Sequence, residues 1–311
     1  MARLRPPRRR GARPALLLCA VLGLAVATPA AAPAATARPD TVPPPVPARR
    51  VVSLAPSITG CLFAVGAGDR VVGVTRWCRL PAAAGLPRVG GILDPDWERI
   101  LALRPDLVVV EAAHAEARRK LAALDLPVLA VEHRTLEGML ASLTRLGRAC
   151  GTVARADSVR RALAARIAAV RRRAAAAPGE PPPVLVAVGV DDATGRVTTV
   201  HAAAAGTFLG ELVTAAGGQP VPEGKVVRYP QLSVEGLLAL APAVILDLAP
   251  DCGDDPARLA RRRAAWAALA DLPAVRRGRV TVVTDPLAAV PGPNVVDTLE
   301  RFAHAIADAR R

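Results

Sequence analysis

The chain has 311 residues, of which 52% are hydrophobic and 22% charged, so it can bury enough apolar surface for two globular domains. Its formal net charge is +14, yet aromatic residues make up only 2% of the chain and no basic run is interleaved with stacking side chains. The composition therefore argues against a disordered chain and against nucleic-acid binding.

The first 32 residues have the pattern of a secretory signal peptide. Six arginines precede an apolar run over residues 15–27, and small residues follow up to Ala32. The run is shorter than the ~20 residues that a membrane-spanning helix needs, which favours a cleaved signal and export to the periplasm. Without these arginines, 35 basic and 27 acidic residues remain, a net charge of +8. Residues 33–49 are rich in proline and alanine and are expected to form a leader without regular structure.

From Arg50 on, short β-branched runs alternate with amphipathic segments, which predicts two α/β lobes. The first lobe, residues 50–151, is predicted to contain strands at Val51–Leu54, Val71–Val74, Leu107–Val110 and Val128–Val131, with helices at Ser57–Val65, Asp96–Leu103, Ala115–Leu124 and Leu136–Ala149. The second lobe, residues 178–311, is predicted to contain strands at Val184–Val190, Val197–Val200, Val244–Leu248 and Val280–Val283, with helices at Gly206–Ala216, Val234–Leu240, Arg258–Leu269 and Val295–Ala309.

Between the lobes, residues 152–177 contain no proline or glycine and predict one long helix. Apolar residues recur at steps of three and four, from Val153 to Ala174, while arginines occupy the other faces. Thr152 is a suitable N-cap, and Pro178 ends the helix. At ~1.5 Å per residue the helix spans ~39 Å, enough to connect two lobes. By itself the segment is also compatible with a helix lying on one domain.

The two lobes share an internal repeat at a constant offset of 137 residues. The segment ERILALRPDLVV, which begins at Glu98, corresponds to EGLLALAPAVIL, which begins at Glu235. Packing explains the apolar matches, but it does not require an acidic residue at the start of each helix. A favourable interaction with the helix dipole is a sufficient structural reason for both glutamates, and a functional role is the alternative.

Several segments resemble the helical-backbone (class III) substrate-binding proteins of ABC importers for vitamin B12, ferric siderophores and haem. They are RVVSLAPSIT, VGAGDRVVGVT, LPRVGG and ERILALRPDLVVV in the first lobe, and YPQLSVEGLLALAPAVIL, LPAVRRGRVTVV and PGPNVVDTLE in the second. The resemblance covers Arg50 to the C-terminus. It implies two Rossmann-like α/β lobes joined by one long helix, with a metal-chelate ligand between them. It also implies a monomer that docks through Glu98 and Glu235 onto an ABC permease dimer with its ATPase subunits.

The resemblance assigns ligand-binding roles to Trp77, Tyr229, Gly91, Ile92 and Asp285. Two aromatic rings facing each other would suit a flat macrocycle, so a corrinoid such as cobalamin is the first expectation, and a ferric siderophore or haem is the alternative. Aliphatic Ile92 and acidic Glu111 stand where vitamin B12 carriers have aromatic residues. Each of the two rings could instead be a partly buried packing residue.

Histidines and cysteines do not predict a metal site, and no cofactor of the protein's own is expected. His114, His133, His201 and His304 are isolated in the sequence and are expected on the surface. Cys61, Cys78, Cys150 and Cys252 remain after signal removal without CxxC spacing, so a disulfide is permitted and zinc is disfavoured. Gly60 replaces the family's usual glutamate, which deprives Ser57 of the acidic partner of a capping box.

An enzyme is the rival class of function. Gly66 and Gly68 lead into a strand and lack the third glycine of a dinucleotide loop, and the chain contains no GxSxG, HExxH or GxxxxGK[ST] motif. We therefore expect no catalytic residues, and ATP must be used by another protein. A scaffold or sensor protein with the same lobes is the third possibility.

Overall fold

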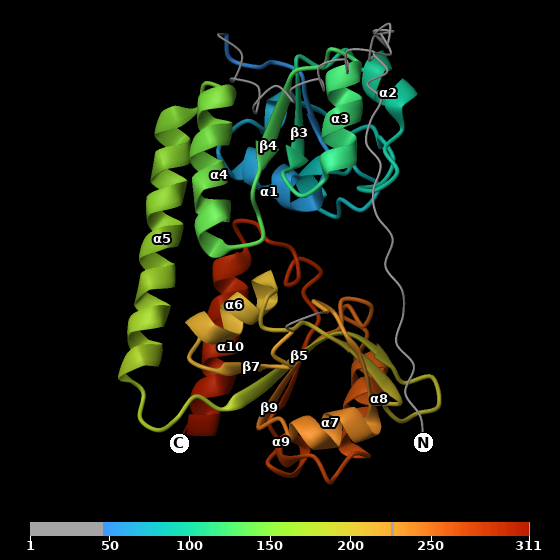
Figure 1. Ribbon diagram of the computed structural model, residues 1–311, viewed down its shortest axis with the longest axis vertical. Coiled ribbons are helices and arrows are strands. Elements are labelled where there is room, and N and C mark those ends of the chain that lie inside the picture. The colour runs from blue at the N-terminus through green and yellow to red at the C-terminus, as the bar shows by residue number, and fades with distance from the viewer. Residues whose placement is uncertain (1–45, 225–226, 311) are drawn as a thin grey trace, which may run out of the picture. The chain divides into compact units, whose positions relative to one another are not determined.

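The computed structural model describes residues 46–224 and 227–310, which form two α/β lobes connected by one long helix (Figure 1). The predicted signal peptide and most of the leader lie outside the described residues. The leader prediction is wrong at its C-terminal end, because Ala48 is buried and its N–H donates to the carbonyl of Ala149 at 2.9 Å. This contact satisfies one of the carbonyls that the end of a helix leaves without a partner.

The first lobe contains a four-stranded parallel sheet in the order β2-β1-β3-β4 within the described residues. Its elements are β1 (Val51–Ser53), α1 (Pro56–Ala64), β2 (Val71–Val74), α2 (Trp97–Ala102), β3 (Leu107–Glu111), α3 (Ala115–Ala123), β4 (Val128–Val131) and α4 (Leu136–Ala149). Successive β3 residues point to opposite faces of the sheet. Leu107 and Val109 join the core that contains α1 and α4, while Val108 joins the core that contains residues of α2 and α3.

The second lobe contains a six-stranded mixed sheet, with the path β10-β9-β5-β6-β8 and with β7 paired to β5, among the residues that the structure describes. Its elements are β5 (Pro183–Asp191), β6 (Thr199–Ala202), α6 (Phe208–Ala215), β7 (Gln219–Val221), β8 (Gln231–Ser233), α7 (Val234–Leu240), β9 (Val244–Leu248), α8 (Pro256–Ala267), α9 (Pro273–Arg276), β10 (Val280–Val283) and α10 (Val295–Arg310). Strands β5, β9 and β10 are parallel, whereas β6 is antiparallel to β5 and β8.

The structure corrects the prediction of this lobe at five elements. Strand β6 lies two residues later than predicted, and β7, β8 and α9 were not predicted. The three missed elements are only three or four residues long, too short for a periodic pattern to show. Helix α8 begins at Pro256, because the Asp255 carboxylate caps it by accepting from the N–H groups of Ala257 and Arg258.

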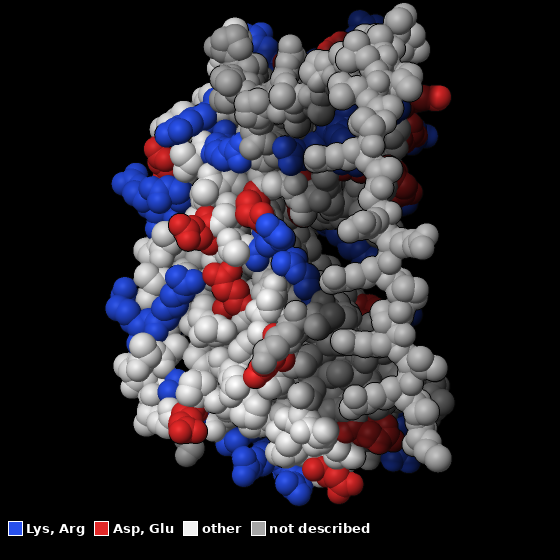
Figure 2. Space-filling model, viewed as in Figure 1, with Lys and Arg blue, Asp and Glu red and all other residues white. Residues whose placement is uncertain are grey.

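The connecting helix is α5 (Val153–Ala176), which confirms the prediction of one uninterrupted helix. Ala156, Leu163, Ile167 and Val170 are its buried residues. Basic side chains gather over its outer side, at the left edge of Figure 2. Thr152 is the N-cap residue, but its side chain makes no capping hydrogen bond. The helix therefore depends mainly on its apolar stripe.

The last helix holds α5 at two places. Arg166 of α5 pairs with Asp297 and Glu300 of α10, at 2.7 and 2.9 Å. At the other end of α10, the Arg310 guanidinium donates to several carbonyls at the C-terminus of α5 and just beyond it, among them that of Ala174 at 2.7 Å. The last carbonyls of a helix have no N–H partner within the helix, and the Arg310 guanidinium supplies hydrogen-bond donors for them.

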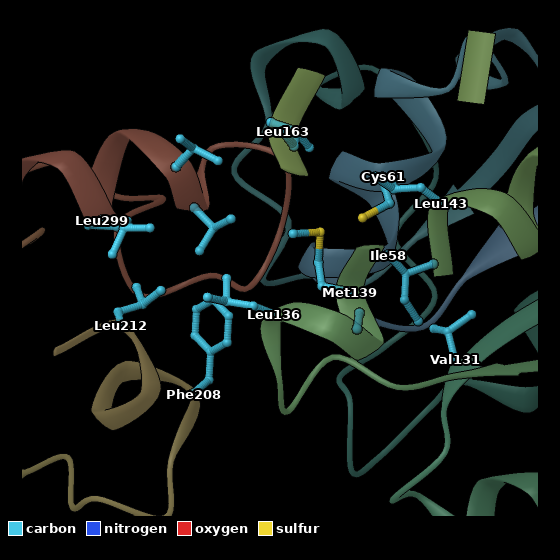
Figure 3. Packing of buried hydrophobic residues seen from close by; sticks show 14 of the residues in the cluster. Ile58, Cys61, Val131, Leu136, Met139, Leu143, Leu163, Phe208, Leu212 and Leu299 are labelled. Carbon is cyan, nitrogen blue, oxygen red and sulfur yellow. The ribbon is translucent and has the colours of Figure 1, made fainter. Parts of the chain in front are cut away.

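One hydrophobic core extends through both lobes. It contains residues of α1 and α4 from the first lobe, of α5, and of α6 and α10 from the second. Figure 3 shows Phe208 of α6 beside Leu136 of α4, with Met139 and Cys61 further into the first lobe. The lobes are therefore joined by shared apolar packing as well as by α5.

The internal repeat continues beyond the matching residues. Strand β3 and strand β9 correspond at the same offset as the glutamates, and so do the N-caps of the preceding helices, Asp96 and Ser233. Arg104 and Ala241, also at this offset, both have φ of 44° and end their helices in the left-handed region before a proline. The repeat is therefore a structural unit of capped helix, left-handed turn and buried strand.

Candidate functional site

Chemically diverse side chains meet where the strands of the first lobe end. Because β1 to β4 are parallel, their carboxyl ends lie at one edge of the sheet, the usual place for ligands in open α/β sheets. Ser57 follows β1, Trp77 follows β2, Glu111 ends β3 and Arg134 follows β4. This edge is the candidate functional site.

Ser57 binds Glu111 and does not cap a helix. Helix α1 begins at Pro56, its N-cap is Ala55, and no side chain caps it. The Ser57 hydroxyl donates to Glu111 Oε1 at 2.9 Å. The capping role that the sequence suggested for Ser57 is therefore wrong, because the hydroxyl is engaged with a carboxylate 54 residues away.

A loop of the second lobe contacts this edge. A Cβ added to Gly60 would lie 3.5 Å from Pro293 Cδ, and one added to Gly292 would lie 3.8 Å from the carbonyl oxygen of Ser57. Residues 292–293 thus pack against the first turns of α1. Gly60 leaves room for this contact, whereas a longer side chain there would have to extend past Pro293.

Tyr229 lies just before β8 in the second lobe and is 49% exposed. Partial burial raises its pKa, Arg228 lowers it, and the carboxylate of Glu111 raises it further. Tyr229 and Glu111 are therefore within electrostatic range of each other, although they belong to different lobes.

Trp77 is 57% exposed and lies under the neighbouring guanidinium of Arg76, 5.5 Å from its ring centroid. Arg76 also pairs with Asp94. A Cβ at Gly91 would lie too close to that carboxylate, so a larger residue there would displace the exposed Arg76 and Asp94 side chains. Gly91 thus has a steric role, and whether Trp77 and Tyr229 hold a ligand between them stays a prediction.

Ile92 lies in a different hollow from the other candidates. This hollow, of about 810 Å³, is between residues 92–97 and α3, and Ile92, Trp97, His114 and Lys120 are among its lining residues. Trp77, Tyr229, Gly91 and Asp285 do not line it. The candidate ligand residues are thus divided between this hollow and the edge described above.

Asp285 organises the loop after β10. Its Oδ1 accepts from the N–H of Leu287 at 2.9 Å, and its carbonyl accepts from the N–H of Ala288 at 3.1 Å. The same loop continues to residues 292–293, which contact α1. Asp285 is therefore placed to shape the segment of the second lobe that approaches the candidate site.

Glu98 and Glu235 occupy equivalent, exposed positions. Each is the second residue of its helix, after the N-caps Asp96 and Ser233, whose side chains accept from backbone N–H groups of the first turn. A hydrogen bond from Ser233 and one from its own N–H lower the pKa of Glu235. Both side chains are exposed, and their docking role remains a prediction.

His133 is buried, which contradicts the expectation of a surface histidine. It is 2% exposed, and its Nε2 is 2.7 Å from Ser142 Oγ, which in turn donates to the carbonyl of Met139. Burial lowers the His133 pKa to about 4. Its position two residues after the last, buried residue of β4 is the signal in the sequence that could have indicated this burial.

The cysteines are buried and unpaired. Cys61, Cys78, Cys150 and Cys252 are all free thiols. Burial raises the pKa of Cys61 to about 12 and that of Cys150 to about 11. Cys61 and Cys150 are therefore poor nucleophiles at neutral pH. Among the described residues, no group of three or more His, Cys, Asp or Glu side chains could hold a metal ion.

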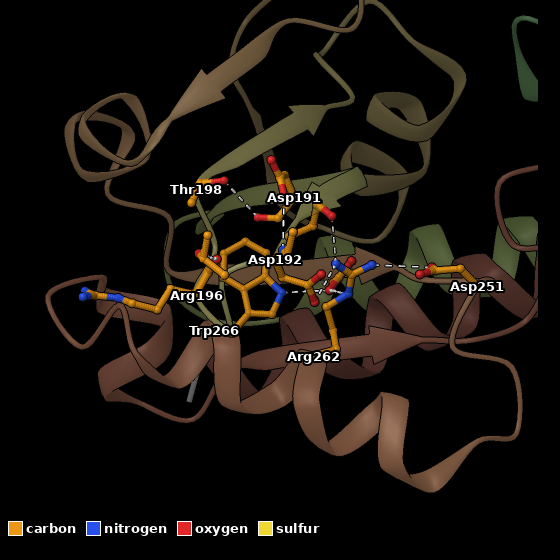
Figure 4. Close-up of polar contacts among 11 residues, drawn as sticks. Asp191, Asp192, Arg196, Thr198, Asp251, Arg262 and Trp266 are labelled. Carbon is orange, nitrogen blue, oxygen red and sulfur yellow. Dashed lines mark hydrogen bonds and ion pairs between the residues drawn. The ribbon is translucent and has the colours of Figure 1, made fainter.

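A buried polar cluster in the second lobe was not predicted (Figure 4). Asp247 of β9 accepts from Trp266 Nε1 at 2.8 Å, and the Arg262 guanidinium lies 3.3 Å from both Asp247 and Asp192. Burial raises the Asp247 pKa to about 6, although Arg262 opposes this shift. The cluster ties α8 to β9 and to the residues after β5, which is a structural role. Its members are separated in sequence, so no local pattern reveals it.

Comparison with known proteins assigns the family. Residues 51–287 match the family described as periplasmic binding protein. A vitamin B12-binding protein of Pectobacterium carotovorum subsp. carotovorum (strain PC1) is 26% identical over 65% of this chain and 72% of its own length. The uncharacterized ABC transporter substrate-binding lipoprotein YvrC of Bacillus subtilis (strain 168) is 24% identical over 83% of this chain and 80% of its own length.

Solved structures have the same fold. The periplasmic vitamin B12 binding protein BtuF of Vibrio cholerae has a TM-score of 0.73 at 24% identity, with 85% of this chain and 99% of that chain covered. The periplasmic heme-binding protein RhuT from Roseiflexus sp. RS-1 has a TM-score of 0.69 at 28% identity, with the same coverage. Within the described ranges, no helix is long and apolar enough to cross a membrane. Since the family match extends over most of the sequence and the structural likeness over both lobes, this chain belongs to the periplasmic binding protein family.

Proposed function

We propose that this chain is the substrate-binding protein of an ABC importer and that it carries a corrinoid between its lobes. The observation that carries the proposal is the exposure of Trp77 and Tyr229. Among the large hydrophobic residues that are exposed in the described part of the chain, these two are the aromatic ones. Trp266 and Phe302, by contrast, are fully buried. Exposed rings beside the ends of the strands suit stacking on a flat macrocycle.

Two other metal chelates are weaker candidates. A haem carrier would need an axial ligand, and Tyr229 is the one tyrosine of the sequence. A siderophore carrier would be expected to have basic residues near residues 290–294, where Val290 and Asn294 stand.

The remaining parts of the proposal follow from family membership and the positions of Glu98 and Glu235. The chain is exported by a cleavable signal peptide and acts in the periplasm as a monomer, without catalytic residues or a resident cofactor. It delivers the ligand to a permease dimer with its ATPase subunits. The two glutamates dock onto arginines of that permease, since exposed acid-to-arginine pairs suit a transient contact.

Titration of the purified protein, residues 33–311, tests this function. Cyanocobalamin, haemin and a ferric hydroxamate are added separately, and binding is followed by calorimetry and by tryptophan fluorescence. We expect cyanocobalamin to bind most tightly and to be recovered chemically unchanged. Binding of none of the three would support a scaffold or sensor protein instead, and turnover of a ligand would support an enzyme.

A further inference from the structure

Glu111 brings a carboxylate without an ion pair to the candidate site. Its side chain is half-buried and accepts one hydrogen bond, from the neutral hydroxyl of Ser57. Among the described residues, no arginine or lysine forms an ion pair with it. Glu111 thus has no ion pair at the end of β3, and it acts on Arg134 only through a longer-range attraction that raises the pKa of that guanidinium.

Two arginines of the same edge are already paired. Arg134 binds the Glu132 carboxylate through Nε at 3.0 Å and Nη2 at 2.9 Å. Arg76 pairs with Asp94. Each of these cations has its own carboxylate, so neither can neutralise Glu111 without breaking an existing pair. Glu111 is therefore left as a carboxylate of this edge without an ion pair among the described residues.

The position of Glu111 lets this charge act on a ligand between the lobes. Ser57, its hydrogen-bond donor, belongs to the turn of α1 that residues 292–293 of the second lobe approach. A carboxylate in a partly desolvated site accepts hydrogen bonds and repels other anions, and repulsion is stronger there than in water.

We propose that Glu111 selects the ligand by charge: it favours a neutral or cationic chelate with N–H donors, and it excludes chelates that present carboxylates. This inference rests on the proposed carrier function and narrows its ligand. The amide side chains of a corrinoid satisfy the acceptor, whereas the two carboxylates of haemin do not.

The test compares two chelates on matched variants. Cyanocobalamin and haemin are titrated into the wild type, Glu111→Gln and Glu180→Gln, after circular dichroism has shown that each variant is folded. Glu180 is exposed and lies between α5 and β5, so its substitution removes the same charge away from the site. We expect Glu111→Gln to lower the ratio of the haemin Kd to the cyanocobalamin Kd at least about tenfold. Glu180→Gln should keep that ratio, since the Glu111 charge stays.

The outcomes separate the inference from the function. If the chelates bind but the ratio is the same in Glu111→Gln as in the wild type, charge selection by Glu111 is wrong and the carrier function stands. If the wild type binds neither chelate, the carrier function fails and the inference fails with it. Should Glu111→Gln not fold, the salt dependence of the wild type decides: screening of a repulsion must strengthen haemin binding as ionic strength rises. Haemin binding that weakens or stays constant with added salt would overturn the inference.

Discussion

The carboxylate of Glu211 in the second lobe accepts a hydrogen bond from the backbone N–H of Leu136 in the first lobe, at 2.8 Å. Leu136 is the first residue of α4, so this N–H has no partner within its own helix. The other oxygen of Glu211 lies 3.4 Å from Arg171 of α5. One side chain of α6 thus joins three helices, in addition to the apolar packing that the lobes share.

Replacing Glu211 should therefore weaken the whole fold. We expect Glu211→Ala to lower the free energy of unfolding by about 1–2 kcal/mol, because a charge-assisted hydrogen bond to a partly buried N–H is lost. Urea denaturation measures this change. Glu137→Ala, an exposed acid in the first turn of α4, is the control and should cost less than about 1 kcal/mol. Equal losses in the two variants would mean that the contact between the lobes contributes nothing.

The lobes should move little when a ligand binds. An uninterrupted α5, the Glu211 contact and one core through both lobes all resist bending between them. We expect the radius of gyration from small-angle scattering to change by less than about 1 Å between the free and ligand-saturated protein. The forward scattering should give the mass of a monomer in both states. A larger change would show a hinge that these contacts do not prevent.

His133 should make the protein sensitive to acid. Its folded pKa of about 4 lies below the ordinary value of 6.5, so between these pH values the unfolded chain takes up a proton that the folded protein does not. This contribution lowers wild-type stability as pH falls through that window, by up to about 3 kcal/mol. His133→Gln removes this contribution. The free energy of unfolding of the variant minus that of the wild type should therefore rise as the pH falls from 7 to 4.

Asp247 acts in the opposite direction and must be separated from His133. Its pKa is raised to about 6, so the folded protein binds a proton before the unfolded chain does, which adds stability as pH falls from about 6. The wild type and His133→Gln both contain Asp247. Its effect therefore cancels when the unfolding free energy of one is subtracted from that of the other at each pH. A difference that stays constant from pH 7 to pH 4 would show that His133 is not the source of acid sensitivity.

Trp77→Ala and Tyr229→Ala should each weaken cyanocobalamin binding by about tenfold to a hundredfold, because a stacking ring is lost. Both side chains are about half exposed, so the variants should unfold at nearly the wild-type urea concentration. Leu93→Ala is a suitable control, since Leu93 is 87% exposed and lines the separate hollow beside α3. If Leu93→Ala weakened binding and the aromatic variants did not, the ligand would occupy that hollow.

Glu98→Gln combined with Glu235→Gln should abolish delivery while folding and ligand affinity are retained. Both side chains are exposed at helix starts, where each contributes little to stability. The readout is stimulation of the partner ATPase by the ligand-bound protein in proteoliposomes, beside calorimetric affinity. Glu116→Gln combined with Glu180→Gln removes the same charge from other exposed sites and should behave as the wild type. If the double variant of Glu98 and Glu235 stimulates the ATPase as fully as the wild type does, the docking assignment is wrong. The two glutamates would then act only as charges at the starts of their helices.

Hydrophobic periodicity in the sequence determined the order of strands and helices, the continuity of α5 and the repeat that pairs Glu98 with Glu235. These features are local, because a strand or helix of sufficient length shows its buried side within a few residues of sequence. The elements that it missed, β7, β8 and α9, are too short for such a pattern.

Only the tertiary structure decided the contacts between distant residues. The Ser57 hydroxyl and Glu111 are 54 residues apart in sequence, and Leu136 and Glu211 are 75 apart. Burial of His133, and of Arg262 among aspartates, likewise depends on which helices cover the sheet. A hydrogen bond or a pKa is set by the atoms that surround a group, and for these groups those atoms come from segments that only folding brings together.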